Sequence, residues 1–322
     1  MDTKSNKRPR EDPVANKKRL VSKTIIYDES KPNQWLDDPP LEIWDHVIIP
    51  MLGLKDLALS RHVCTFFEAY WQDKFSNNVL PLRVGNDVAT IDRAMRVIEI
   101  LSSRREYTKL NPCVVLLGKG DHEITSSWTD GGGEEISTIL AIICSNITFV
   151  GEGIDTTTIL GGFFIDNQEN ITFKNMTVTN LTNNGIRIED SLVELVEVAI
   201  TQCECGLSVT GGEDSKNKEQ VVLTRCQFAQ NEYGIFLHDH SNIKMTDCVS
   251  NNNKSDGLVA FGATINIHGE ATAIHSNQRC GIRAYNSVKV VIHLPSHHNT
   301  IYNNGGQDRF THSGGTITNV PS

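Results

Sequence analysis

The feature that most constrains this chain is a short apolar alternation that returns about every 22 residues through its second half. From first residue to first residue the steps are 22, 28, 22, 22 and 23, for the segments Ile171-Thr172-Phe173, Val193-Glu194-Leu195, Val221-Val222-Leu223, Ile243-Lys244-Met245, Ile265-Asn266-Ile267 and Val288-Lys289-Val290. A repeat at a fixed period indicates stacked supersecondary units, each packed on its neighbours. The second half of the chain is therefore expected to fold as an array.

A second repeat lies between these segments, and it places a glycine before an alternating strand at Gly185, Gly206, Gly234, Gly257 and Gly281. Within each unit, runs of three to five residues alternate with period two and are separated by Asn, Gly, Asp and Thr. Such runs are typical of strands joined by turns, and none is long enough for an amphipathic helix. The pattern predicts a parallel β-helix with one coil per repeat and about 4.8 Å between coils.

Equivalent side chains of successive coils should then stack in columns. Five residues after the first repeat come Met176, Val198, Cys226 and Cys248, which we expect to point inward and stack. Glu270 and His293 follow at the same offset, which indicates that the register slips or the stack ends there. The long step of 28 contains a polar, glycine-led insertion over residues 210–219, which predicts a loop on one edge.

Residues from about Pro112 to Asn304 resemble the right-handed parallel β-helix superfamily, the pectin-lyase-like fold. The opening segments Val114-Val115-Leu116-Leu117, Gly118-Lys119-Gly120 and Asn146–Gly151 are similar to the start of its members. The resemblance implies a mainly β chain with a solenoid over residues 110–306 and a C-terminal tail over 307–322. This fold hosts lyases, hydrolases, epimerases, adhesins and binding scaffolds, so it does not decide the function.

An amphipathic helix precedes the repeats over residues 86–105. Its apolar residues recur at helical spacing, at Val88, Ile91, Met95, Ile98 and Leu101. Asn86 or Asp87 is expected to cap its N-terminus, and Arg104 and Arg105 suit the dipole at its C-terminus. The open end of a stack of strands needs a cover, and we expect this helix to supply it.

Residues 36–80 are expected to form a small helical module, and their sequence is similar to an F-box. The resemblance rests on Pro40-Leu41-Glu42-Ile43-Trp44, Leu54-Lys55-Asp56-Leu57 and Arg61–Phe67, although the order Pro40-Leu41 reverses the Leu-Pro that the family often has. It implies binding to the S-phase-kinase-associated adaptor of cullin–RING ligases through Pro40, Leu41, Ile43, Ile48, Leu52, Leu57 and Val63. The alternative is an unrelated helical hairpin packed on the end of the β-helix.

The N-terminal tail over residues 1–34 is polar and is expected to be disordered. The chain carries a net charge of −9, whereas residues 1–23 alone carry eight Lys or Arg and three Asp or Glu. The acidic body therefore disfavours nucleic acid as a partner. Two basic clusters in the tail resemble a bipartite nuclear-import signal, with a merely solvated tail as the alternative, and they consist of Lys7, Arg8, Arg10, Lys17, Lys18 and Arg19.

The sequence contains no apolar N-terminal segment typical of a signal peptide and no apolar run of 18 residues, so no membrane partner is expected. The eight cysteines lie mostly in strand positions without the paired spacing of a metal site. We expect buried free thiols, no metal and no cofactor, which indicates an intracellular protein of the nucleus or cytoplasm.

The strongest catalytic candidates are three carboxylates that each follow a coil glycine by five residues, namely Asp166, Asp190 and Asp239. Stacking would place Asp166 and Asp190 roughly 5 Å apart, as a calcium-assisted lyase or a two-carboxylate glycosidase requires. The favoured alternative is that they are turn residues whose side chains bond local backbone. The segment His238-Asp239-His240 and the histidines at 293, 297 and 298 are likewise interpreted as solvated turns and loops. No convincing catalytic constellation results.

Arg187 and Arg283 occupy the same outward position in coils four apart, with Ser208, Phe236 and Val259 between them. Arginine and aromatic residues are favoured anchors of protein interfaces, so we expect the two arginines and Phe236, with the 210–219 loop, to contact a substrate protein. The resulting hypothesis is a substrate-recognition adaptor of a cullin–RING ubiquitin ligase whose β-helix is a non-catalytic scaffold. The alternative is a carbohydrate-active, lyase-like or hydrolase-like, or carbohydrate-binding β-helix protein, for which Asp166, Asp190 and Asp239 are the candidate residues.

Overall fold

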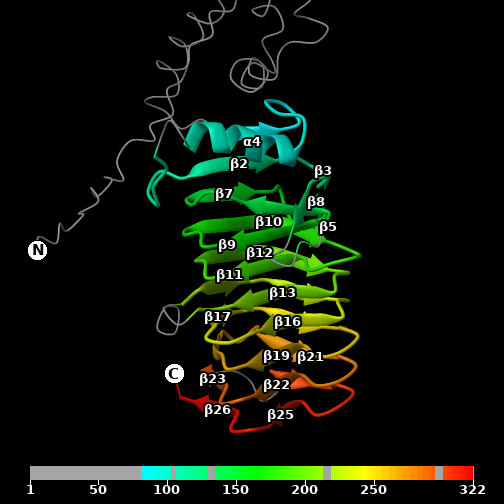
Figure 1. Ribbon diagram of the computed structural model, residues 1–322. Coiled ribbons are helices and arrows are strands. Elements are labelled where there is room, and N and C mark those ends of the chain that lie inside the picture. Colours follow the sequence, from blue (N-terminus) through cyan, green and yellow to red (C-terminus); the bar gives the residue numbers. More distant parts are fainter. Residues whose placement is uncertain are drawn as a thin grey trace, which may run out of the picture. The chain divides into compact units, whose positions relative to one another are not determined.

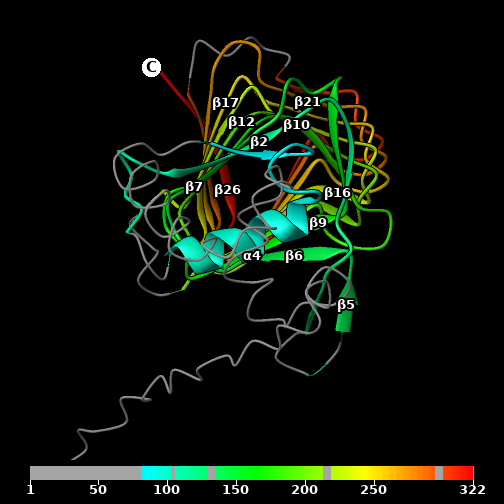
Figure 2. The same cartoon turned by 90° about the horizontal axis from the view of Figure 1, so that it is seen from above.

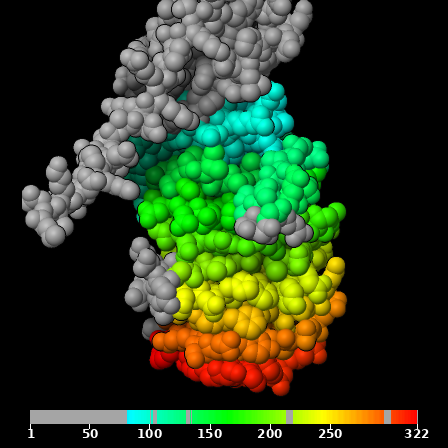
Figure 3. Space-filling view, in the orientation of Figure 1, coloured from blue at the N-terminus to red at the C-terminus, as the bar shows by residue number. Residues whose placement is uncertain are grey.

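A computed structural model describes residues 81–102, 106–129, 133, 135–212, 219–293 and 300–321. These residues form a column of stacked β-coils with one helix at its N-terminal end (Figure 1). Figure 3 shows the coils as successive bands of colour along the column. No helix of this described part has the length and apolar character needed to cross a membrane. The expected tail over 1–34 and the module over 36–80, with their adaptor-binding and import-signal residues, lie outside the described residues.

The larger sheet has 16 strands and supplies two walls of each coil. Each of its strands pairs in parallel with the equivalent strand of the next coil, as the residue-by-residue pairing shows. Its main path runs β1 (Leu82–Val84), β2 (Cys113–Leu117), β7 (Ile147–Val150), β10 (Ile171–Thr179), β12 (Val193–Thr201), β14 (Val221–Thr224), β17 (Asn242–Thr246), β20 (Thr264–His268), β23 (Lys289–His293) and β26 (Thr316–Val320). Off this path lie β3 (Gly120–Glu123), β8 (Thr157–Leu160), β15 (Gln227–Ala229), β18 (Val249–Asn251), β21 (Ala273–His275) and β24 (Ile301–Tyr302).

The smaller sheet has eight parallel strands and forms the remaining wall. In spatial order its strands are β6 (Ile139–Ile142), β9 (Gly162–Asp166), β11 (Ile186–Glu189), β13 (Cys205–Thr210), β16 (Tyr233–Leu237), β19 (Leu258–Phe261), β22 (Ile282–Tyr285) and β25 (Arg309–Thr311). An antiparallel hairpin of β4 (Ser127–Thr129) and β5 (Glu135–Ser137) protrudes from the side of the column (Figure 2).

The registers confirm the expected stacking of the first repeat from Ile171 to Ile265. The last repeat differs, because Ile265 pairs with Val290 and the repeat therefore begins two residues later than expected. A strand keeps the same residues inward when it shifts by two, so the alternation alone does not distinguish the two registers.

The glycines of the second repeat stand where two coils approach most closely. A Cβ added at Gly257 would lie 2.6 Å from Asn277 Nδ2 and 2.9 Å from the carbonyl oxygen of Gly281. At Gly234 it would lie 2.3 Å from Ser250 Oγ. The repeat of glycine therefore reflects the absence of room for any side chain at this turn.

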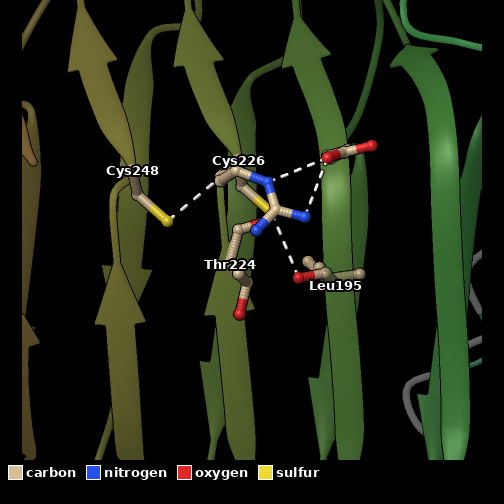
Figure 4. A network of polar contacts seen from close by, with 6 residues as sticks. Leu195, Thr224, Cys226 and Cys248 are labelled. Atoms are coloured by element: carbon tan, nitrogen blue, oxygen red, sulfur yellow. Dashed lines mark hydrogen bonds and ion pairs between the residues drawn. The ribbon is translucent and has the colours of Figure 1, made fainter. Parts of the chain in front are cut away.

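The inward column that was expected from Met176 onward is present. Met176 pairs with Val198, and both are buried, as are Cys226 and Cys248 in the following coils. The backbone N–H of Cys226 donates to Cys248 Sγ at 3.4 Å, and Cys226 Sγ lies 3.3 Å from the carbonyl oxygen of Leu195 (Figure 4). The column continues with Thr272, whose hydroxyl accepts from the N–H of Cys248, rather than with Glu270.

A buried asparagine column lines the turn beside the glycines, and the sequence analysis did not foresee it. The column consists of Asn231, Asn253, Asn277 and Asn304. The backbone N–H of each of the first three donates to the side-chain oxygen of the asparagine in the next coil, at 3.0–3.1 Å. Their spacings of 22, 24 and 27 residues are the sequence signal that was available. These bonds satisfy backbone groups that the turns would otherwise leave unpaired inside the protein.

Helix α4 (Ile91–Ser102) covers the first coil. Ile91, Met95 and Ile98 are buried in the same core as Val115 and Leu117 of β2. The helix begins at Ile91 rather than at the expected residue 86, and residues 103–105 of the expected range lie outside the described residues. The hydroxyl of Thr90, rather than Asn86 or Asp87, accepts from a first-turn N–H, that of Arg93. Asp87 instead closes a tight turn by accepting from the N–H of Arg83.

The column of coils extends further toward the C-terminus than expected, because β25 and β26 add strands where a tail over 307–322 was predicted. Arg309 and Asn319 stack on the buried Ile282 and Ile292, so both occupy inward positions of the last coil. Arg309 Nη1 donates to Asn319 Oδ1 at 3.1 Å, which joins the two walls across the end of the core. Because polar residues occupy inward positions here, the sequence lacks the apolar alternation from which a further coil would have been predicted.

Candidate functional site

The outer surface of the eight-stranded sheet, here called the aromatic flank, presents two parallel rows of side chains. The registers place in the first row Phe164, Arg187, Ser208, Phe236, Val259, Arg283 and Phe310. The second row contains Asp166, Glu189, Thr210, His238, Phe261, Tyr285 and His312, of which the two histidines directly follow paired strand residues. The three residues expected to contact a substrate, Arg187, Phe236 and Arg283, thus lie in one row.

Aromatic rings stack along the C-terminal half of the flank. The ring centroids of Phe261 and Tyr285 are 4.9 Å apart with an interplanar angle of 4°, and those of Phe236 and Phe261 are 5.8 Å apart with an angle of 27°. Phe236 also contacts the imidazole of His238 at 4.7 Å. Rings stacked in this way cover each other's faces and direct their edges, where the partial charge is positive, toward the surroundings.

Arg187 is held in place at the N-terminal half of the flank. Its Nε donates to Glu189 Oε1 at 2.8 Å, and its guanidinium carbon lies 5.6 Å from the ring centroid of Phe164 and 5.7 Å from that of Trp128. Trp128 comes from the β4–β5 hairpin and packs on Phe164 with 4.1 Å between ring centroids. The hairpin therefore covers this part of the flank and leaves Phe164 only 7% exposed.

Arg283 has a buried partner. Its Nη2 lies 3.1 Å from Oδ1 of Asp256, a carboxylate with no exposed surface, and the same oxygen accepts from the N–H of Cys280 at 2.7 Å. The guanidinium carbon lies 5.7 Å from the ring centroid of Phe310. Since removing one member of a buried ion pair is strongly destabilising, Arg283 contributes to the stability of the coil as well as to the flank.

The acidic candidates occupy different stacking positions from those expected. Asp166 pairs with Glu189, not with Asp190, because Gly162 rather than Gly161 opens β9. Gly161 has a φ of +137° and belongs to the preceding turn. A displacement of one residue moves a side chain from one row to the next.

Glu189 and Asp190 nevertheless influence Asp166. Burial raises the pKa of Asp166, and the charges of Glu189 and Asp190 raise it further. The Asp190 carboxylate accepts from the N–H of Gly212, and Asp166 accepts from Asn167 Nδ2 at 2.7 Å. Asp190 and Asn167 both have positive φ, as turn residues often do.

Asp239 lies apart from this acidic group in the turn after β16, where its carbonyl oxygen accepts from the N–H of Gly211. The adjacent His238 is exposed, and partial burial lowers the pKa of its imidazole. Among the described residues, no three His, Cys, Asp or Glu side chains are arranged to hold a metal ion. The structure therefore brings Asp166 near Asp190 but does not bring Asp239 to them.

Three thiols, those of Cys203, Cys205 and Cys226, are poorly suited to nucleophilic chemistry. Burial raises the pKa of Cys203 to about 12, and burial with the charges of Glu204, Cys203 and Glu232 raises that of Cys205 to about 12. Burial likewise raises the pKa of Cys226. A thiol reacts as its thiolate, so these residues act here as small packed side chains.

The family model described as "Right handed beta helix region" matches residues 161–320. This region is a right-handed β-helix. The matched segment includes the coils from β9 onward, which carry most of the aromatic flank.

Comparison with other proteins gives no further identification of this β-helix. No curated protein matches the chain. Among solved structures, ORF18 of Geobacillus virus E2 is 13% identical with a TM-score of 0.31, and the match covers 66% of this chain and 53% of that one. This chain therefore spans about half the length of the viral protein.

Two further solved structures are similar, both A-modules of mannuronan C-5 epimerases from Azotobacter vinelandii. The AlgE4 module is 12% identical, with a TM-score of 0.23 and coverage of 77% of this chain and 96% of that one. The AlgE6 module is 10% identical, with a TM-score of 0.27 and coverage of 71% and 93%. Similarity at this level concerns the fold alone.

Several members of the flank were not predicted from the sequence. Trp128 lies in a hairpin outside the repeats, and Phe310 lies in the coil that was expected to be a tail. Phe261 and Tyr285 each lie two residues after a first-row residue, so continuing the alternation beyond Val259 and Arg283 would have found them.

Proposed function

We propose that this protein is a non-enzymatic substrate-recognition subunit of a cullin–RING ubiquitin ligase, with the β-helix as its substrate-binding scaffold. On this proposal residues 36–80 bind the S-phase-kinase-associated adaptor, and the aromatic flank binds a substrate protein. The two basic clusters of the tail would direct the protein to the nucleus. A rigid bridge of this kind raises the effective concentration of a substrate near the ubiquitin-transfer machinery.

The observation that carries the proposal is the composition of the flank. It combines two arginines held by carboxylates with stacked aromatic rings, the residue types enriched at protein interfaces. Helix α4 covers the first coil, and the last coil carries the polar pair Arg309 and Asn319 at inward positions. A partner is therefore expected to bind a lateral surface.

The first test uses the purified full chain and the purified S-phase-kinase-associated adaptor in isothermal titration calorimetry. We expect a one-to-one complex that is weakened at least tenfold by Leu41→Ala together with Ile43→Ala. Exposed Leu110 of the β-helix gives the matched control, because Leu110→Ala should leave the affinity unchanged. Absence of binding by the wild-type chain would refute the ligase proposal.

The second test concerns the flank. Arg187→Glu is preferred to the reversal of Arg283, because a carboxylate at position 283 would face the buried Asp256 and unfold the coil. Arg187→Glu should reduce the recovery of proteins that co-purify with the full chain, while Lys174→Glu on the larger sheet should not. Equal recovery by the two variants would argue against the flank as the binding surface.

The second candidate function is carbohydrate binding or modification, and the acidic group at Asp166, Glu189 and Asp190 is the observation that favours it. Against it, Phe261 and Tyr285 cover each other's faces and so offer no flat ring surface to a sugar. Incubation of the protein with acidic and neutral polysaccharides tests this candidate function. Cleavage, epimerisation or binding of the polysaccharide would support it if Asp166→Asn or Asp190→Asn abolishes the effect.

A further inference from the structure

The aromatic flank contains the same pair of groups twice, an arginine over a phenylalanine of an adjacent coil. Arg187 lies over Phe164 at 5.6 Å, and Arg283 lies over Phe310 at 5.7 Å, measured from the guanidinium carbon to the ring centroid. Both arginines belong to the first row, and both are fixed by a carboxylate, Glu189 or Asp256. The two pairs therefore offer similar, preorganised surfaces.

At the first pair, Arg187 with Phe164, a side chain of the same protein already packs on both residues. Trp128 packs on Phe164 with the two rings tilted by 36°, and the guanidinium of Arg187 lies over both rings, at 5.7 Å from Trp128 and 5.6 Å from Phe164. Phe164 is consequently 7% exposed. Burial of an aromatic ring with a cation on its face is favourable because apolar area is removed from water and the ring quadrupole attracts the charge.

At the second pair the ring that packs on Phe310 belongs to Tyr285 of the flank itself, and no described aromatic residue from outside the sheet packs on Phe310 as Trp128 packs on Phe164. Phe310 remains partly exposed, beside Tyr285 at 5.8 Å, and His312 lies near the same Tyr285 ring at 5.9 Å. Part of this exposure follows from the place of Phe310 in the last coil. The side chains nevertheless reproduce the surface that Trp128 covers at the other end of the flank.

We propose that Arg283 and Phe310 receive an aromatic side chain from the protein partner, in the manner in which Arg187 and Phe164 receive Trp128. The proposal rests on the proposed function and specifies the partner: an extended or hairpin segment that carries an exposed tryptophan or phenylalanine. An aliphatic side chain would fill the space but would gain no attraction from the guanidinium. The fixed arginine also loses little side-chain freedom on binding, which favours affinity.

The test uses the full chain and a fluorescein-labelled peptide with the sequence of residues 125–136, which contains the tryptophan of the hairpin. Fluorescence anisotropy measures binding of this peptide and of a matched peptide with alanine in place of the tryptophan. We expect the tryptophan peptide to bind the wild-type chain at least tenfold more tightly. Equal binding of the two peptides, or no binding of either, would overturn the proposal.

Variants of the chain locate the site. Phe310→Ala and Phe310→Leu should each weaken binding at least fivefold, and the leucine variant retains apolar burial in case the alanine variant folds poorly. Tyr302→Ala is the control, because Tyr302 is a partly exposed aromatic residue that stacks on His275 outside the flank. Equal effects of the substitutions at 310 and 302 would contradict the assignment.

Trp128→Ala provides an independent measurement, since it uncovers Phe164 and should raise the peptide stoichiometry from one to two. A stoichiometry that stays at one would show that the two arginine–phenylalanine pairs are not equivalent and would refute the analogy. The result is also separable from the ligase test. Adaptor binding without peptide binding refutes only this inference, and peptide binding without adaptor binding refutes only the ligase proposal.

Discussion

At the scale of single residues, Cys203 interrupts the buried asparagine column. Its backbone N–H donates to Asn231 Oδ1 at 2.9 Å, as asparagines do in later coils, but its own Sγ accepts from the N–H of Asn180 at 3.2 Å. Sulfur is a weak acceptor, and a thiol lacks the amide N–H that Asn231 donates to the carbonyl oxygen of Ile200. The column is therefore weakest at this coil.

We predict that Cys203→Asn raises the free energy of unfolding by about 1 kcal/mol, because it replaces a weak acceptor and adds a buried hydrogen bond. Urea denaturation measures the change. Leu223→Asn is the matched control, since this inward side chain packs in the apolar core between Leu195 and Met245 and the amide would be buried among apolar groups, which should destabilise the protein. A loss of stability in both variants would contradict the prediction.

Asp166 gives a prediction about pH. Burial, Glu189 and Asp190 raise its pKa in the folded protein. The folded state then holds this proton more tightly than the unfolded chain does, so the carboxylate reduces stability at neutral pH, and acidification through the native pKa removes that cost. Asp166→Asn should be more stable than wild type at pH 7 by a few tenths of a kcal/mol, roughly, since the side chain is exposed and screened.

The stability advantage of Asp166→Asn should fall as the pH is lowered and vanish below about 3.9, the pKa of aspartate in an unfolded chain. Urea denaturation of both proteins at several pH values between 7 and 3.5 provides the measurement. A difference in unfolding free energy that is independent of pH, or a less stable variant at pH 7, would show that the carboxylate is not penalised in the folded state.

At the scale of elements, the start of five strands of the smaller sheet depends on a glycine, namely β11, β13, β16, β19 and β22. Gly257→Ala should lower the free energy of unfolding by about 2–3 kcal/mol, because the new methyl group would overlap Asn277 and the backbone of the next coil. Gly118→Ala is the matched control, since an added Cβ there meets nothing within 4 Å. Thermal denaturation should separate the two variants, and similar melting temperatures would refute the close-approach explanation.

The elements also show how far the sequence predicts this fold. The coil period, the glycine column and the inward cysteines were predictable because close packing restricts those positions to glycine or to apolar residues. The register at Asp166 was not predictable from the sequence. Two adjacent glycines, Gly161 and Gly162, could each have been the glycine before the strand, and only the backbone shows that Gly161, with its positive φ, belongs to the turn. Hydrogen-bonded polar columns, such as that of Asn253, resemble ordinary turn residues until neighbouring coils are seen together.

The candidate site was less predictable than the fold. Arg187, Phe236 and Arg283 follow from the alternation of one row. The partners that fix the arginines do not, because Asp256 lies in a turn and Trp128 in a hairpin outside the repeats. Contacts of this kind depend on the path of the chain between coils, which periodicity does not encode.

At the scale of the whole molecule, the polar residues at the C-terminal end of the column oppose end-to-end association of two chains. Arg309→Val with Asn319→Ile would continue the apolar columns of Ile282 and Ile292 to an open end. We expect this double variant to self-associate end to end, since exposed edge strands over an apolar surface pair readily with other chains. Light scattering coupled to size-exclusion chromatography should show a mass that rises with protein concentration.

The control for the double variant makes the corresponding change on a lateral surface, with Lys244→Val and Asn266→Ile on adjacent strands of the larger sheet. This variant should keep the mass of the wild-type chain. If both double variants associate equally, general hydrophobicity rather than the loss of the polar end would be responsible.

The two arginine–phenylalanine pairs are separated by a whole number of coils, since Arg187 and Arg283 are four register steps apart. At about 4.8 Å per step the arginines lie roughly 19 Å apart along the axis. The β-helix thus holds the two pairs at a fixed distance, which is a whole number of coil spacings. In the Trp128→Ala variant both pairs are uncovered, and a ligand with two aromatic groups at the natural distance could contact both. Removing one full coil between the pairs would shorten that distance by about 4.8 Å, so the same ligand would then contact only one pair.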